Sequence, residues 1–95
     1  TSMDGVNCVL AEFTADQTKK MQLVATHQED LPDKLKQTAL AISMSDGKAS
    51  FIEIAELDVQ FGRLFAESVI NLLKKANISA DQVVVVGSHG QTIWH

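Results

Sequence analysis

The sequence is poor in cysteine and has no long apolar run. Its one cysteine, Cys8, cannot form a disulfide within the chain, and no basic flank followed by an apolar stretch resembles a signal peptide. We therefore expect a reducing compartment, the cytoplasm. The longest aliphatic run covers residues 83–86, whereas a membrane helix needs about 20 apolar residues. The sequence thus predicts no membrane partner.

An excess of basic charge is also missing. Eight Lys and Arg side chains against twelve Asp and Glu leave a formal charge of −4, which repels a phosphate backbone. We therefore expect no nucleic-acid partner. Ninety-five residues, of which 45% are hydrophobic, suffice for one domain at most. This length excludes a complete two-lobed enzyme, and we expect the chain to be a piece of a longer protein.

The chain does contain a regular series of strand and helix patterns. In residues 6–13 most side chains are apolar at both the odd and the even positions, which predicts a strand that is covered on both faces. Residues 21–27 form a second strand pattern. The two runs predict an antiparallel hairpin. A proline at 32 and apolar residues at helical spacing then predict a helix of about three turns, which ends near residues 45–47.

A second, longer helix is predicted to begin at Ser50, which forms a capping-box pattern with Glu53. Asn77 can close this helix in the left-handed conformation, and Gly62 within it indicates close packing. Residues 82–86 predict a buried strand that runs parallel to others. The fold class is therefore α/β, a mixed sheet with an N-terminal antiparallel hairpin, two helices and a parallel strand.

Two segments do not fit this core-building pattern, and the first consists of Thr1, Ser2, Met3, Asp4 and Gly5. Its hydroxyls and backbone N–H groups can surround a phosphate, and Asp4 is available to a magnesium ion or its waters. Asp-Gly is also a strong hairpin-turn signal. A tight turn is therefore the alternative interpretation, and the two interpretations can coexist.

The second segment, residues 87–92, follows directly after the valine run. Ligands bind at the carboxyl ends of strands in open α/β sheets. Gly90 lets the backbone approach a ligand closely, while His89, Gln91 and Thr92 offer donors and acceptors for sugar hydroxyls or an amide. The alternative is a polar loop that simply leaves the sheet.

Other reactive side chains are assigned structural roles. On an extended strand His89 and His95 would lie about 20 Å apart, so we expect no zinc site. Cys8 lies in an apolar strand, which is typical of a structural thiol. We expect His27 at the surface, near the end of its strand.

Three motifs together resemble the anhydro-N-acetylmuramic acid kinase family of bacteria. They are Thr-Ser-Met-Asp-Gly-Val at 1–6, Leu-Asp at 57–58 with Phe-Gly-Arg-Leu-Phe-Ala at 61–66, and Gly-Ser-His-Gly-Gln-Thr-Ile-Trp-His at 87–95. The resemblance covers the whole chain and implies an actin-like or ribonuclease H-like ATPase lobe. Residues 1–95 would be the N-terminal part of the first lobe of a two-lobed kinase, and the short strand ending in Ser-Gly that precedes this part in the family is absent.

The same resemblance implies an ATP- and magnesium-dependent enzyme of peptidoglycan recycling and amino sugar catabolism. It would open the 1,6-anhydro ring with water and phosphorylate O6, giving N-acetylmuramic acid 6-phosphate. By position, residues 1–5 would contact the ATP phosphates, and His89, Gly90, Gln91 and Thr92 would lie in the segment that contacts the sugar. The family commonly has an aspartate where this chain has Asn7, so we assign Asn7 no metal role.

The resemblance also implies a homodimer for the intact protein and a general base beyond position 95. We therefore expect the chain alone to have no kinase activity. The alternative from a different class is a non-catalytic carbohydrate- or nucleotide-binding module with an actin-like sheet. A purely structural interaction domain ranks last, because it would leave the glycine-bracketed polar loops without a purpose.

Overall fold

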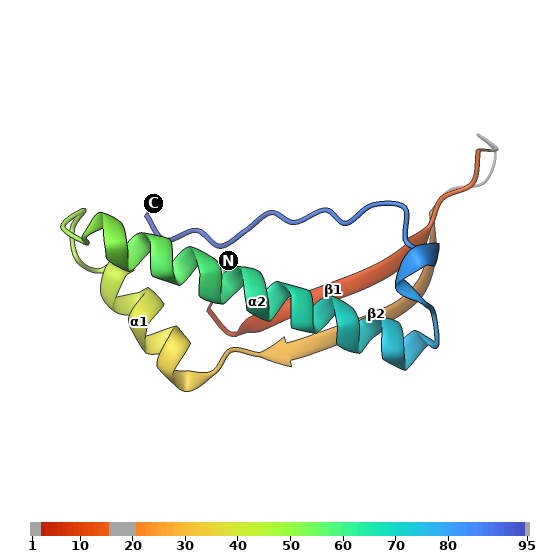
Figure 1. Cartoon of the computed structure of the whole chain (residues 1–95), viewed down its shortest axis with the longest axis horizontal. Helices are drawn as coiled ribbons and strands as arrows, with labels where there is room; N and C mark the ends of the chain where they lie inside the picture. Colours follow the sequence, from red (N-terminus) through yellow and green to blue (C-terminus); the bar gives the residue numbers. More distant parts are fainter. Residues whose placement is uncertain (1–2, 16–20, 95) are drawn as a thin grey trace.

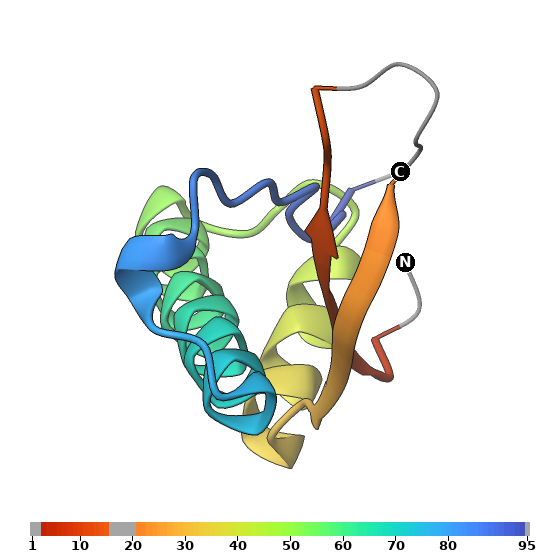
Figure 2. The same ribbon diagram turned by 90° about the vertical axis from the view of Figure 1, so that its right-hand side faces the viewer.

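The computed structural model describes residues 3–15 and 21–94. It contains two strands, β1 (Gly5–Glu12) and β2 (Gln22–Asp30), then two helices, α1 (Asp33–Ser43) and α2 (Phe51–Ala76), and a short 3-10 turn, η1 (Ala80–Gln82). The strands form one layer, and α2 lies along them with α1 at one end (Figure 1). Both helices lie on the same side of the strands (Figure 2). The α/β class expected from the sequence is confirmed.

The strands pair as the antiparallel hairpin that the sequence predicts. Cys8 lies opposite His27 and Leu10 opposite Ala25, and the register shifts directly after Leu10. Cys8 and Leu10 are half-buried toward α2, whereas Val9 on the other face is 66% exposed. The expectation that this strand is covered on both faces is therefore wrong, because both helices pack on one face.

Helix α1 begins directly after Pro32 and ends at Ser43, close to the predicted position. Its buried side chains are Leu35, Ala39 and Ile42, which recur at the spacing of one helical face. The chain then turns through residues 46–47, which both have positive φ.

Helix α2 shows the predicted caps at both ends. The N–H of Ser50 donates to Glu53 Oε1 at 2.9 Å, and the N–H of Glu53 donates to Ser50 Oγ at 3.1 Å. These bonds satisfy two backbone donors that a helix start otherwise leaves unpaired. At the other end Asn77 takes a left-handed conformation with φ 55°. Both capping predictions are confirmed.

The hydrophobic core lies where α1 and α2 meet. Buried residues from both helices and from the connection before α1 form one cluster, made of Leu31, Leu35, Ala39, Ile42, Leu57, Phe61 and Leu64. Met3 and Ile93 are partly buried against it, so segments near both ends of the described chain rest on the same core.

The valine run is not the buried parallel strand that the sequence predicts. Residues 83–94 are neither helix nor strand, and Val84, Val85 and Val86 are 98%, 80% and 61% exposed. A strand needs a neighbour to accept and donate its backbone hydrogen bonds. In the part of the chain that is described, β1 pairs only with β2, and a cavity of about 290 Å³ separates β1 from the valine run. The larger sheet of an actin-like or ribonuclease H-like lobe stays a prediction.

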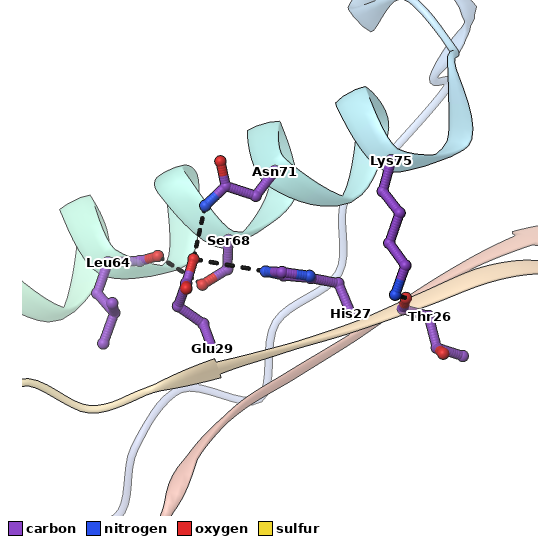
Figure 3. A network of polar contacts seen from close by, with 7 residues as sticks. All are labelled: Thr26, His27, Glu29, Leu64, Ser68, Asn71 and Lys75. Carbon is purple, nitrogen blue, oxygen red and sulfur yellow. Dashed lines mark hydrogen bonds and ion pairs between the residues drawn. The ribbon is translucent and has the colours of Figure 1, made fainter.

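Polar contacts fix β2 beneath α2 (Figure 3). Asn71 Nδ2 on α2 donates to Glu29 Oε1 on β2 at 2.6 Å, and His27 Nε2 lies 3.5 Å from the same oxygen. Lys75 Nζ donates to the carbonyl oxygen of Thr26 at 3.1 Å. His27 thus lies within its strand, half-buried under the helix. The expectation of a surface residue near the strand end is wrong, because His27 lies on the face of β2 that α2 covers, with Glu29 Oε1 3.5 Å from its Nε2.

Candidate functional site

Two cavities flank the segment of residues 88–91. The larger, of about 510 Å³, lies between α2 and residues 88–93, and we call it the helix cavity. Its helix wall is formed by Ile54, Leu57, Asp58, Phe61, Gly62 and Phe65. The smaller, of about 290 Å³, lies between β1, the second half of α2 and residues 83–91, and we call it the strand cavity.

The segment between the two cavities owes its shape to a local turn. Gly90 has φ 71°, a left-handed conformation that glycine adopts without steric cost. The N–H of Gly90 donates to Ser88 Oγ at 3.1 Å, which closes the turn around His89. Among the residues that the structure describes, no hydrogen bond engages the imidazole of His89, so the ring is free to contact a ligand.

Three of the four residues expected to contact a sugar line both cavities. They are His89, Gly90 and Gln91. The fourth, Thr92, lines neither cavity, and its carbonyl oxygen accepts a hydrogen bond of 3.0 Å from Gln91 Nε2. The structure thus brings together the first three, and sugar contact by all four residues stays a prediction.

The expected phosphate loop reaches the strand cavity through Gly5. A Cβ at this position would lie 2.6 Å from the carbonyl oxygen of Glu29 on β2, so the close pairing of the strands itself requires glycine here. Met3 and Asp4 form a turn that leads into β1, whose first residue is Gly5. Asp4 is exposed and lines neither cavity, whereas the side chain of Met3 packs on the core.

The first two residues of that loop, Thr1 and Ser2, lie outside the described residues, as does His95. Across residues 3–15 and 21–94, no group of three or more His, Cys, Asp and Glu side chains is placed to hold a metal ion. Within the same residues, no helix is both long enough and apolar enough to cross a membrane.

Asp58 and Gly62 line the helix cavity, although we expected no ligand role for either residue from the sequence. They stand four apart on α2 and therefore on one face, beside the apolar stripe. A Cβ built on Gly62 meets nothing within 4 Å. The expectation of close packing at Gly62 is wrong, because this position opens onto the helix cavity. The sequence signal that could have identified them is their spacing of four residues, directly beside the apolar stripe of Leu57 and Phe61.

The thiol of Cys8 does not have the properties of a nucleophile. It is half-buried in β1, and its pKa is raised, first by burial and then by the negative charge of Glu29. A raised pKa leaves the thiol protonated near neutral pH, whereas reactive cysteines have a lowered pKa. This agrees with the structural role expected from the sequence.

Cavities that are walled by apolar helix residues and bordered by a polar loop are typical of small-molecule sites in α/β proteins. The comparisons with known proteins identify the family. A family model described as "Anhydro-N-acetylmuramic acid kinase" matches residues 1–95. This chain belongs to that family.

Curated relatives carry the same name. The proteins called anhydro-N-acetylmuramic acid kinase from Coxiella burnetii (strain RSA 493 / Nine Mile phase I) and Vibrio vulnificus (strain YJ016) are 41% identical over 95 residues and 42% over 96. A third, from Shewanella pealeana, is 42% identical over 95 residues. All of this chain is covered, and it spans about a quarter of the length of these relatives, 24% to 25%.

Proposed function

We propose that this chain forms part of a kinase that acts on 1,6-anhydro-N-acetylmuramic acid. The enzyme opens the anhydro ring with water and transfers a phosphoryl group from ATP to O6, giving N-acetylmuramic acid 6-phosphate. Its place is in peptidoglycan recycling and amino sugar catabolism, in the cytoplasm, as a homodimer. The family membership and the names of the relatives support a kinase over a non-catalytic binding module.

One observation in the structure supports the proposed positions of the two substrates. Gly5, from the expected phosphate loop, and residues 88–91, from the expected sugar segment, line the same strand cavity. They are more than 80 residues apart in the sequence. Phosphoryl transfer requires the phosphate donor and the accepting hydroxyl to be held side by side. Because residues 88–91 line both cavities, phosphates in the strand cavity and a sugar in the helix cavity would meet at this segment, which supports a shared site.

The oxygen ligands among the described residues are too few to bind magnesium by themselves, so the ion would also need the phosphates of ATP as ligands. Asp4 offers one exposed carboxylate. Mg²⁺ is commonly bound by one or two carboxylates together with substrate phosphates and waters. Asp4 would thus hold the ion through a water or directly, and the ion would neutralise charge on the phosphates. Residues 1–5 supply backbone N–H groups for the same phosphates.

Attack of water on the anomeric carbon requires a general base. Our proposal places this base outside the 95 residues. The chain alone is therefore expected to have no kinase activity. An assay of the chain with ATP, magnesium and the anhydro sugar should give no sugar phosphate, and detectable turnover would contradict this part of the proposal.

Binding of the two ligands tests the assignment of the segments. In calorimetric titrations of the intact enzyme, His89→Ala should weaken binding of 1,6-anhydro-N-acetylmuramic acid about tenfold, since one hydrogen bond to a ligand is worth roughly 1 kcal/mol or more. Binding of ATP with magnesium should change little. The matched control is Gln37→Ala, an exposed residue on α1 that lines neither cavity. An equal loss for both ligands would count against the assignment.

A further inference from the structure

The helix cavity holds one carboxylate, that of Asp58. The described residues that line this cavity include no lysine and no arginine. Asp58 is exposed, and no hydrogen bond or ion pair engages it in residues 3–15 and 21–94. Asp58 therefore lines the cavity with all of the acceptor capacity of its carboxylate available.

This charge restricts what the cavity can bind. An unpaired carboxylate accepts hydrogen bonds from hydroxyl or amide N–H groups, and it repels a phosphate or a second carboxylate at short range. Across the cavity lie His89 and Gln91, which add further polar contacts. Phe61 and Phe65, with ring centroids 5.8 Å apart, supply an apolar wall for the C–H groups of a sugar ring.

We propose that Asp58 is a ligand-binding residue that sets the orientation of the sugar. Its carboxylate accepts a hydrogen bond from a hydroxyl or the amide N–H of the ligand, and it directs the ligand's lactyl carboxylate away from the helix cavity. The inference rests on the proposed function, because it takes the anhydro sugar as the ligand. It adds a charged residue on α2 to a site whose other polar side chains come from residues 88–91.

Gly62 contributes to the same contact by leaving space. It lies one helical turn after Asp58, and the volume that a side chain would occupy there is open. A bulky side chain at position 62 would enter the helix cavity without breaking the helix. Gly62→Leu therefore tests the location of the ligand independently of any charge.

The experiment measures dissociation constants of the intact protein by calorimetry for two probes. One is 1,6-anhydro-N-acetylmuramic acid, and the other is 1,6-anhydro-N-acetylglucosamine, which lacks the lactyl carboxylate. Asp58→Asn should weaken binding of the second probe about tenfold, because hydrogen bonds to charged groups are worth roughly 1.5–3 kcal/mol. Binding of the first probe should weaken less, since the substitution also removes repulsion. Gly62→Leu should abolish binding of both.

Glu56→Gln is the matched control, an exposed carboxylate on α2 that lines neither cavity, and it should bind as the unchanged chain does. Unchanged affinity in Asp58→Asn would overturn this inference alone and leave the proposed function intact. Tighter binding of the muramic acid by Asp58→Asn would also overturn it, because the lactyl carboxylate would then face Asp58. Failure of the unchanged chain to bind either probe would contradict both the inference and the proposed sugar site.

Discussion

Asn71 on α2 donates a hydrogen bond of 2.6 Å to the carboxylate of Glu29 on β2. This bond joins two elements 42 residues apart, and both side chains are partly buried. Asn71→Leu should lower the free energy of unfolding by about 1–3 kcal/mol, because it leaves a partly buried carboxylate without its donor. Urea denaturation measures the change.

The control for that substitution is Gln60→Leu, an exposed amide on the same helix. Its effect should stay within about 0.5 kcal/mol, as for surface substitutions in general. Equal destabilisation by the two variants would show that the bond to Glu29 contributes nothing specific.

Two phenylalanines of α2 should differ in how much they contribute to stability. Phe61 is 6% exposed and belongs to the main cluster, whereas Phe51 at the helix start is 85% exposed. Phe61→Ala should cost about 3–5 kcal/mol of stability, the usual range for a buried aromatic ring. Phe51→Ala should cost little. Thermal unfolding of both variants measures this difference, and similar melting temperatures would contradict the packing of α2.

The capping box of α2 predicts a stability that depends on pH. The pKa of Glu53 is lowered from its ordinary value of 4.5. The larger cause is the hydrogen bond from the backbone N–H of Ser50, and the smaller is a hydrogen bond with the Ser50 side chain. A group whose folded-state pKa is lowered stabilises the fold above its unfolded pKa, and this stabilisation is lost as the pH falls through the folded pKa. The window therefore lies below about pH 4.5.

Glu53→Gln should keep a hydrogen bond to the Ser50 backbone and remove this pH dependence. Urea unfolding at pH 7 and pH 3 measures this dependence. The difference in free energy of unfolding between the unchanged chain and the variant should be larger at pH 7 than at pH 3. The matched control is Glu56→Gln, which removes an exposed carboxylate of α2 that takes no part in the capping box. A constant difference for Glu53→Gln would show that the carboxylate is not part of the cap.

Two glycines should respond in opposite ways to the same substitution. Gly5→Ala places a Cβ 2.6 Å from a backbone oxygen of β2 and should destabilise the hairpin. Gly62→Ala meets open space within a helix and should stabilise the chain by about 1 kcal/mol, the difference in helix propensity. Denaturation midpoints of the two variants decide this, and destabilisation by Gly62→Ala would show that the position is packed.

Local chemistry accounts for what the sequence predicted well. The cap at Ser50 and the left-handed Asn77 depend on neighbours within a few residues, and the hairpin follows from two adjacent apolar runs. The stripe through Leu57 and Phe61 identified the buried face of α2 in the same way. These features need no knowledge of distant contacts.

The failures concern contacts between distant parts of the chain. Four consecutive valines have high strand propensity, but a strand also needs a partner, and the valine run has none among the described strands. Likewise, helix propensity made Gly62 unusual without showing whether a neighbour or a cavity lies beside it. For the site, the sequence motifs identified residues 88–91. Only the structure shows that Asp58 lines the same cavity as these residues.

The meeting of helix α2 with residues 88–91 around a sugar can be measured directly. In ¹H–¹⁵N spectra of the labelled intact protein, titration with 1,6-anhydro-N-acetylmuramic acid should shift the amides of residues 88–91 and those of residues 54–65 along one binding curve. Amides of the exposed Gln37 and its neighbours on α1 should not move. Shifts confined to α1 or the outer face of the hairpin, or no shifts at all, would contradict a sugar site between α2 and this segment.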